Sequence, residues 1–274
     1  MRLLALLGGG IAAALGCAVG AAYGVGSPIA GGVEGTDTWS IVFLSAAAIA
    51  FVLYVTALLA LRSHANALRL ALALTVLIQL VPLTGPPLLS RDAYSYWAYG
   101  RIVWVHNDNP YDHAPARYPD DPATVAAAPA WRHPTSVYGP TFTVASAGVA
   151  AVAGSSRWTA AFLFRATAAL AVAATVLVAA RIPTRKALAA APVGWNPLFA
   201  LHFAGGGHND ALMVLGMVAA LALARWRSGA ASGSFWIVAA SVKSIALLLL
   251  PLALLRSRRG VCLAGYLLAD RVPF

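Results

Sequence analysis

The side chains in this sequence that could do chemistry gather in one polar stretch, from Ser90 to Pro140, between long apolar runs. The chain has nine acidic residues. Five of them lie in this stretch: Asp92, Asp108, Asp112, Asp120 and Asp121. Functional side chains tend to lie in loops that a rigid scaffold positions, so we expect the reactive site here. Asp92 is the strongest candidate, because it follows directly on an apolar run and so lies close to a membrane surface.

Asp92 is suited to act as a general base. Ser90 can cap a helix that begins at this point, and the positive end of that helix favours a carboxylate in its first turn. Such a carboxylate can take the proton from a hydroxyl group that attacks an activated sugar carbon, which is help typically worth about 10²–10⁴ in rate. The plainer alternative is that Asp92 only caps a surface helix while Arg91 binds a lipid phosphate.

A phosphate leaving group would need cations that hold its negative charge while the bond to the sugar breaks. The candidates are Arg101, Arg165 and Lys243. Arg165 and Lys243 lie inside apolar runs, where a charged side chain costs about 2.5–3.5 kcal/mol on insertion scales, so a function is the default explanation. The alternative is that each charged end snorkels to the membrane surface.

Other polar side chains are expected to line the same substrate site. A run of three glycines breaks a helix and presents His208, Asn209 and Asp210 at the membrane edge. Tyr96, in the aromatic segment after the acid, and Tyr138, in a Tyr-Gly-Pro turn, are the aromatic candidates for substrate binding. His208 and Asp210 could bind a metal ion, but no third good ligand accompanies them, so we expect neither a metal site nor a cofactor.

Composition places these residues in a membrane protein. Hydrophobic residues make up 60% of the chain and charged residues 10%, whereas soluble domains have about 25% charged residues. The net charge is +10, yet Lys and Arg fall mostly at the ends of apolar runs, as in cytoplasmic membrane loops. The composition predicts an all-α, polytopic transmembrane bundle forming a single domain over residues 1–274. It argues against a soluble domain and against a nucleic-acid partner.

Apolar runs at about 3–24, 39–61 and 68–89 are each long enough for a membrane-crossing helix, which needs about 20 residues. Arg62 and Arg69 flank one connection, whereas the connection at 25–38 carries acidic charges only. The positive-inside rule therefore predicts a multi-pass plasma membrane protein whose N-terminus and residues 62–69 are cytoplasmic. The loops at 25–38 and about 90–137 are then outside. The aromatic segment at 94–104 resembles an interfacial belt, so we expect its helix to lie along the membrane surface.

The apolar runs after residue 137 must keep their basic ends in the cytoplasm. We therefore expect 138–155 to be a short, partly inserted helix that returns to the outer face. The run 158–180 then crosses inward, with Arg165 near its outer end, 187–207 leads outward and 211–224 returns. Lys243 lies in the middle of the run 234–255. Two short helices that meet near Lys243 would keep the flanking basic clusters inside and direct this side chain toward the outer cavity.

Several motifs, in their order, resemble the GT-C superfamily of membrane glycosyltransferases, and within it the polyprenol-phosphate-mannose-dependent α-1,6-mannosyltransferases (the MptA/MptB family). The matching segments are 90–101, Asn-Pro-Tyr at 109–111, Trp131 with Tyr-Gly-Pro at 138–140, Asn-Pro-Leu at 196–198, Gly-Gly-Gly-His-Asn-Asp-Ala-Leu-Met at 205–213 and Val-Lys at 242–243. The resemblance implies a catalytic Asp at position 92, a polyprenyl-phosphate-mannose donor, inversion at the sugar carbon and a lipomannan-type mannan acceptor. Family members are longer, so it also implies further helices after the point where this chain ends.

Three other functions are compatible with the sequence. A transporter or flippase for a lipid-linked or anionic substrate could line its pathway with Arg165, Lys243 and Asp210. Polar residues would then gather near the membrane midplane in two related halves, whereas here they gather at one face. A member of the same superfamily could transfer another sugar, such as arabinose or glucose. A chain shorter than its relatives could also be an inactive scaffold that binds a partner.

Overall fold

The fold is an all-helical membrane bundle over the residues that a computed structural model describes, which are 1–25, 38–64, 66–182, 185–225 and 229–251. The helices in chain order are α1 (Arg2–Val25), α2 (Thr38–Leu61), α3 (Leu68–Leu80), η1 (Val81–Thr84), α4 (Asp92–Trp104), η2 (Pro115–Arg117), α5 (Pro122–Ala126), η3 (Pro129–Trp131), α6 (Pro140–Ala153), α7 (Arg157–Ala179), α8 (Lys186–Gly194), η4 (Phe199–Ala204), α9 (Asp210–Arg225), α10 (Gly229–Val242) and η5 (Ser244–Leu249). The η elements are short 3₁₀-helices, except η4, which is a π-helix.

The helices α1, α2 and α7 are long and apolar enough to cross a membrane. Helices form there because a bilayer offers no water to the backbone N–H and C=O groups, so these groups must bind one another. The expected long apolar helices at 3–24, 39–61 and 158–180 are confirmed. The expected helix at 68–89 is wrong, because α3 ends at Leu80 and gives way to η1. Pro82 has no N–H to continue the α-helical pattern.

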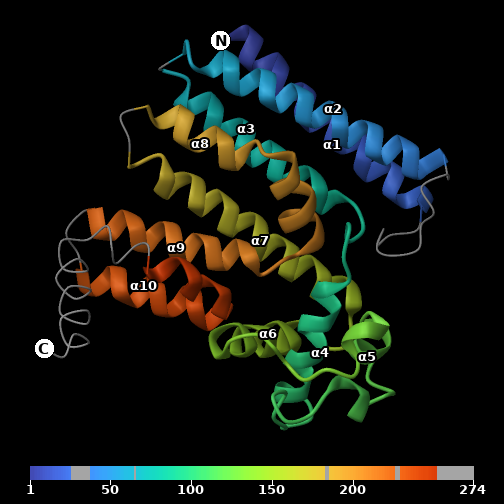
Figure 1. The fold of residues 1–274 in the computed structure, drawn as a ribbon. Helices are drawn as coiled ribbons and strands as arrows, with labels where there is room; N and C mark the ends of the chain where they lie inside the picture. The colour runs from blue at the N-terminus through green and yellow to red at the C-terminus, as the bar shows by residue number, and fades with distance from the viewer. Residues whose placement is uncertain (26–37, 65, 183–184, 226–228, 252–274) are drawn as a thin grey trace, which may run out of the picture.

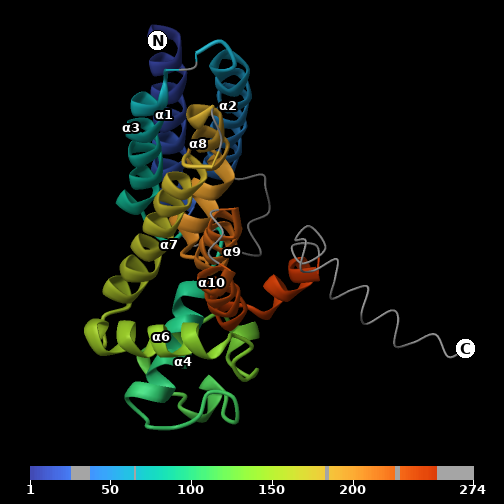
Figure 2. The same cartoon turned by 90° about the vertical axis from the view of Figure 1, so that its left-hand side faces the viewer.

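The crossing helices are surrounded by shorter ones. The contacts pair α1 with α2, α3 with α8, and α9 with both α7 and α10. Figures 1 and 2 show α1, α2, α3 and α8 together at the end where the chain begins, with α4 and α6 at the other end. Trp195 follows α8, is fully buried, and donates from its indole Nε1 to the carbonyl oxygen of Ala71, 2.9 Å away. This bond fixes α8 against α3.

The aromatic helix α4 is buried in the protein, so most of its aromatic side chains pack inside the protein and do not form the exposed interfacial belt that the sequence suggested. Tyr94, Tyr96, Trp97 and Tyr99 are all buried, and Trp104 at the end of the helix is exposed. α6 covers one face of α4. The two backbones approach so closely at Gly100 that a Cβ there would overlap the carbonyl oxygen of Ser146. Glycine is therefore required for this packing.

A polar loop of short helices links α4 to α6, as expected, and buried charges hold it to α4. Asp121 caps α5 by accepting from the N–H of Ala123. The same carboxylate accepts from Nε of Arg101 at 2.8 Å and bonds Nε2 of His106 at 2.8 Å. A second carboxylate, Asp108, accepts a hydrogen bond from the hydroxyl of Tyr118. These contacts give the loop a defined shape.

The expected path of the chain after the loop is confirmed at two points. α6 has 14 residues, which is too short for a full crossing of about 20 residues. Helix α10 ends at Val242 and η5 begins at Ser244, so Lys243 lies in an extended break between them. The loop at 25–38 and the basic residues Arg256, Arg258 and Arg259 lie outside the described residues, except for residues 25 and 38 themselves.

Candidate active site

The glycine run ahead of α9 positions the polar side chains of the site. Gly207 has φ +78°, a left-handed conformation that favours glycine, and it packs against the start of the Arg165 side chain and against Ala93 of α4. The carbonyl oxygen of Gly205 accepts from the N–H of Leu88 at 2.9 Å. A break in the helix was expected here. The break places His208 and Asn209 in contact with residues at the N-terminal end of α4, and Asp210 in contact with Lys243.

The central contact of the site joins Asp92 and His208. Nδ1 of His208 lies 3.2 Å from Oδ2 of Asp92, and the imidazole side chain is 9% exposed while the carboxylate is 23% exposed. The N–H of Asp92 is itself bound by Oγ of Ser90 at 2.9 Å. Asp92 thus begins α4 as expected, with Arg91 at the cap position and Ser90 supporting it from one residue earlier.

Two tyrosines extend this contact into the protein. The hydroxyl of Tyr96 lies 3.5 Å from Oδ2 of Asp92 and 3.4 Å from Oδ1 of Asn209. The ring of Tyr138 meets the ring of Tyr96 edge to face, with centroids 4.9 Å apart. Nδ2 of Asn209 and Nε2 of His208 are buried without a hydrogen-bond partner among the described residues. Buried polar groups are nearly always satisfied, so these two nitrogens mark the site as one that receives further polar groups.

The surroundings of Asp92 keep it ionised. Burial raises the pKa of this carboxyl, but hydrogen bonds from His208 and Ser90, and the positive charges of His208 and Lys243, together lower the pKa below its ordinary value of 3.8. Burial, assisted by the charge of Asp92, raises the pKa of Tyr96 well above its ordinary value. Tyr96 therefore keeps its proton and can donate it, while Asp92 is ready to accept one.

A second charged pair lies beside the first. Nζ of Lys243 is 2.8 Å from Oδ1 and 3.0 Å from Oδ2 of Asp210, and the two side chains are about one third and one quarter exposed. The break between α10 and η5 aims the ammonium group at the first residue of α9. Lys243 therefore lies close enough to the Asp92 cluster for its charge to act on Asp92.

Arg165 lies apart from this cluster. Its guanidinium is 3% exposed and donates from Nε to the carbonyl oxygen of Ala204 at 3.3 Å. Its other two nitrogens donate to the carbonyl oxygens of Gly85, at 2.8 Å, and of Pro82. All three nitrogens thus bind backbone, and the side chain ties α7 to η1 and η4. Arg165 is the ninth residue of α7, in the half of the helix that contacts α4 and α5.

The side chains of the remaining two predicted residues form no hydrogen bond or ion pair with the cluster among the described residues. Arg101 follows Asp92 by nine residues on α4, about 13 Å along a helix, and it binds Asp121 and the carbonyl oxygen of Gly154. Arg91 is exposed at the start of α4. The structure therefore groups Asp92 with the tyrosines, the three residues of the His-Asn-Asp motif and Lys243, and it leaves the three arginines outside.

Two features of the site were not nominated from the sequence. His202, in the π-helix η4, stacks on His208 with ring centroids 3.8 Å apart. Residues six apart do not share a face of a regular α-helix, so the spacing gave no signal. Leu89, just before Ser90, has φ 62°. A left-handed conformation at a bulky residue is uncommon and costs on the order of 1–3 kcal/mol, and such strain clusters at functional sites.

No group of three or more His, Cys, Asp or Glu side chains that could hold a metal ion occurs within the described ranges. The chemistry that the site offers is a carboxylate base, a neutral tyrosine donor, an imidazole and an ammonium group.

Fold and site together define an all-helical membrane protein with its ionisable groups gathered between α4, α9 and α10. The chain belongs to the MptA/MptB family, since the family model described as "Alpha-(1->6)-mannopyranosyltransferase, N-terminal domain" matches residues 2–259. The resemblance noted in the sequence is thereby confirmed.

Individual relatives agree with this assignment. The chain is 34% identical over 201 residues to alpha-(1->6)-mannopyranosyltransferase A of Mycobacterium tuberculosis, covering 68% of this chain and 38% of that protein. It is 29% identical over 182 residues to the protein of the same name from Corynebacterium glutamicum, covering 65% and 37%. The chain thus spans less than two fifths of these relatives. No solved structure matches it.

Proposed function

We propose that this chain carries the catalytic site of a membrane glycosyltransferase that moves mannose from polyprenyl-phosphate-mannose to a mannan-type acceptor outside the plasma membrane. The observation that carries the proposal is the meeting of Asp92 with His208, beside the Asp210–Lys243 pair, in a chain of the mannosyltransferase family. The name of the relatives gives an α-(1→6) linkage, so the acceptor group is the hydroxyl on carbon 6 of a mannose residue.

Asp92 acts as the general base. The acceptor hydroxyl oxygen attacks carbon 1 of the donor mannose from the side opposite the phosphate, its proton passes to a carboxylate oxygen of Asp92, and the configuration at carbon 1 inverts. The lowered pKa of Asp92 makes the carboxylate a weak base. Proton transfer is therefore late, after the new carbon–oxygen bond has begun to form and the hydroxyl has become acidic.

Lys243 assists the leaving group. As the bond between carbon 1 and the phosphate oxygen breaks, the phosphate gains a negative charge, which a nearby ammonium group stabilises. Lys243 is bound to Asp210 in the free protein, so the donor phosphate competes with that carboxylate. Nδ2 of Asn209, buried without a partner among the described residues, is suited to bind a sugar hydroxyl. The proposed reaction needs no metal and no cofactor.

Other predicted residues receive supporting roles in this proposal. Arg165 and Arg101 are bound to backbone and to Asp121, so we assign them the task of holding α7 and the loop in place. Exposed Arg91, next to the base, is suited to an anionic lipid head at the membrane surface. The charged cluster lies in one place, between α4, α9 and α10, which favours an enzyme. A transporter would distribute such groups over two related halves of the bundle.

The test is transfer of radiolabelled mannose from polyprenyl-phosphate-mannose in membranes that contain the full-length protein or its Asp92→Asn variant. Loss of a general base typically lowers the rate by about 10²–10⁴, so we expect kcat to fall by this factor with little change in KM for the donor. The amide of Asn has nearly the size and shape of the carboxylate, so we expect the variant to fold like the wild-type protein.

The matched control is Asp120→Asn, which changes an exposed carboxylate of the same loop. We expect wild-type transfer from this variant. Equal transfer by Asp92→Asn and the wild-type protein would exclude Asp92 as the base, and absence of transfer by the wild-type protein would contradict the mannosyl donor.

A further inference from the structure

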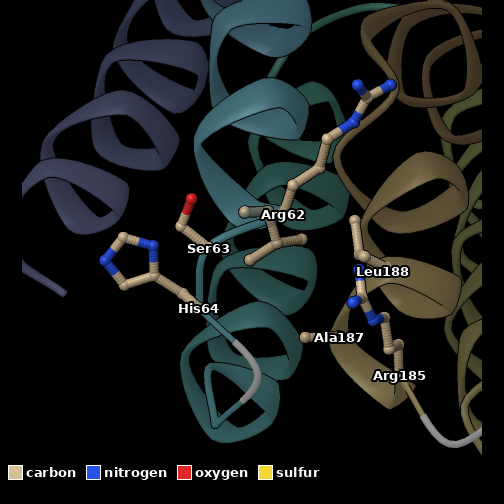
Figure 3. Close-up of a pocket in the computed structure, with 7 residues that line it drawn as sticks. Arg62, Ser63, His64, Arg185, Ala187 and Leu188 are labelled. Carbon is tan, nitrogen blue, oxygen red and sulfur yellow. The ribbon is translucent and has the colours of Figure 1, made fainter.

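A pocket bordered by basic side chains lies at the other end of the bundle from α4 and α6. It is formed where α2 ends and α8 begins, has a volume of about 100 Å³, and is lined by Leu61, Arg62, Ser63, His64, Arg185, Ala187 and Leu188. Figure 3 shows Arg62 and Arg185 on opposite sides of α8 residue Leu188. Figures 1 and 2 place these helix ends beside the N-terminus of the chain. The proposed mannosyl transfer does not use this pocket.

The pocket is rich in positive charge that no neighbour neutralises within the described part of the chain. Neither Arg62 nor Arg185 forms a salt bridge there. The described carboxylates are the five of the loop, Asp92 included, together with Asp210, and all of them belong to the α4 loop or the start of α9. Arg62 and Arg185 are exposed, and so are the other basic residues near these chain segments, Arg69, Arg181 and Lys186. Arg62 and Arg185 therefore attract an anion in the pocket, and no described carboxylate competes with it for them.

Backbone groups of α8 add to this attraction. The helix begins at Lys186, and the first N–H groups of a helix have no partner within it. Ala187 and Leu188 lie in this first turn and line the pocket. The partial positive charge and free N–H groups at a helix start favour phosphate. His64 does not contribute in the same way, because its Nδ1 is bound to the carbonyl oxygen of Ala60 at 3.0 Å and its ring points away from the two guanidinium groups (Figure 3).

The size and place of the pocket fit one phosphate group. The volume of about 100 Å³ is several times the roughly 10–15 Å³ that one water molecule needs on this measure, so a small anion has room. The pocket lies at the ends of membrane helices, the level at which lipid head groups are found, and basic pockets between such helices bind anionic head groups. Arg62 and Arg185 can each offer a planar fork of donors to phosphate oxygens.

We propose that this pocket is a binding site for a phosphate group, supplied by an anionic phospholipid of the inner leaflet or by free phosphate. Two arginines and the start of α8 hold the anion. Binding links α2 to α8 and so stabilises the folded bundle. The site stands independently of the proposed mannosyltransferase activity, since it shares no residue with the Asp92 cluster.

The test measures the midpoint of thermal unfolding of the full-length protein in lipid nanodiscs. One arm compares phosphatidylcholine discs with discs that also contain phosphatidylglycerol, and the other adds inorganic phosphate to phosphatidylcholine discs. We expect a rise in the midpoint in at least one arm. A rise with phosphatidylglycerol alone identifies a lipid head group as the ligand, and a rise with phosphate alone identifies the free anion. No rise in either arm would overturn the proposal.

The variant pair Arg62→Gln with Arg185→Gln removes both guanidinium groups. Charges near an anionic surface contribute about 1 kcal/mol each, so the apparent affinity should fall roughly 30-fold. The matched control, Arg69→Gln with Arg181→Gln, removes the same charge from two exposed residues that do not line the pocket. We expect a loss of less than about threefold from this control, since the pocket itself is intact. Equal losses from the two double variants would mean that surface charge alone attracts the anion, and the site would be refuted.

Discussion

At the scale of single residues, Asp92 illustrates how a buried carboxyl can remain charged. Burial alone would raise its pKa, yet contact with His208 and the nearby Lys243 reverses the direction. A carboxyl with a lowered folded-state pKa stabilises the protein above its unfolded-state pKa, and this contribution is lost as the pH falls through the lowered value. Asp92 therefore stays ionised throughout the neutral and mildly acidic range.

Replacing His208 by Phe should move the acid limb of activity to higher pH. Phe keeps a ring that can stack on His202 but removes both the hydrogen bond and the charge that lower the pKa of Asp92. Burial, which raises the pKa, then dominates. The measurement is kcat/KM for mannose transfer as a function of pH, in which we expect a shift of the acid limb by about one unit or more.

His113→Phe provides the comparison, because His113 bonds the loop carboxylate Asp108 and lies outside the Asp92 cluster. Its pH profile should match that of the wild-type protein. An unchanged pH profile in the His208 variant would mean that His208 does not set the pKa of Asp92.

Most residues of the cluster could be predicted from the sequence. A carboxylate after an apolar run, a glycine run with three polar residues and a lysine in an apolar run are rare in a membrane protein, so each attracts attention by type alone. The positions of Arg101 and Arg165 were harder to predict, because the sequence does not reveal which buried groups they bind. Arg101 is matched to Asp121 twenty residues later, and Arg165 to three backbone carbonyls.

At the scale of helices, Arg165 links three elements. Its guanidinium joins α7 to η1 and to η4 through backbone carbonyl oxygens. Arg165→Lys keeps the charge but cannot reach three acceptors. We expect a loss of about 2–4 kcal/mol in the free energy of unfolding, since buried acceptors are left unpaired, and little change in KM for the donor. Unfolding of the purified protein in detergent and donor KM in membranes are the two measurements.

Arg157→Lys, at the exposed start of the same helix, should leave stability within about 0.5 kcal/mol. A large rise in KM for the donor in the Arg165 variant, with stability unchanged, would restore Arg165 as the phosphate ligand.

Helix patterns predicted some elements correctly and misled on others. The break at Lys243 and the short α6 followed from keeping basic ends on one side of the membrane, a constraint that acts on the whole chain. The aromatic run of α4 read as an interfacial belt, because Tyr and Trp are common both at membrane surfaces and in packed interiors. What decides between them is the close approach of α6 at Gly100, a tertiary contact that sequence alone does not reveal.

At the scale of the whole molecule, the described carboxylates gather toward one end of the bundle, while basic residues occur at both ends. The described carboxylates belong to α4, its loop and α9, whereas Arg62 and Arg185 lie where α2 ends and α8 begins. The positive-inside rule then assigns the arginine end to the cytoplasm. Labelling with a membrane-impermeant maleimide checks this, in a background with Cys17 and Cys262 changed to Ser.

In intact cells we expect Asp120→Cys to react and Asn66→Cys to react only after the membrane is opened, because the two positions are exposed on opposite ends of the bundle. Both variants should react in opened membranes, which serves as the control. The reverse pattern would invert the orientation and place the Asp92 cluster inside the cell.

The loop and the charged cluster share one backbone junction. The N–H of Gly139 donates to the carbonyl oxygen of Val242 at 3.2 Å, and the hydroxyls of Thr141 and Ser241 are 2.7 Å apart. Val242 directly precedes Lys243, so the end of the loop holds the backbone that carries the ammonium group, and a substitution at Gly139 would reach Lys243 through this contact.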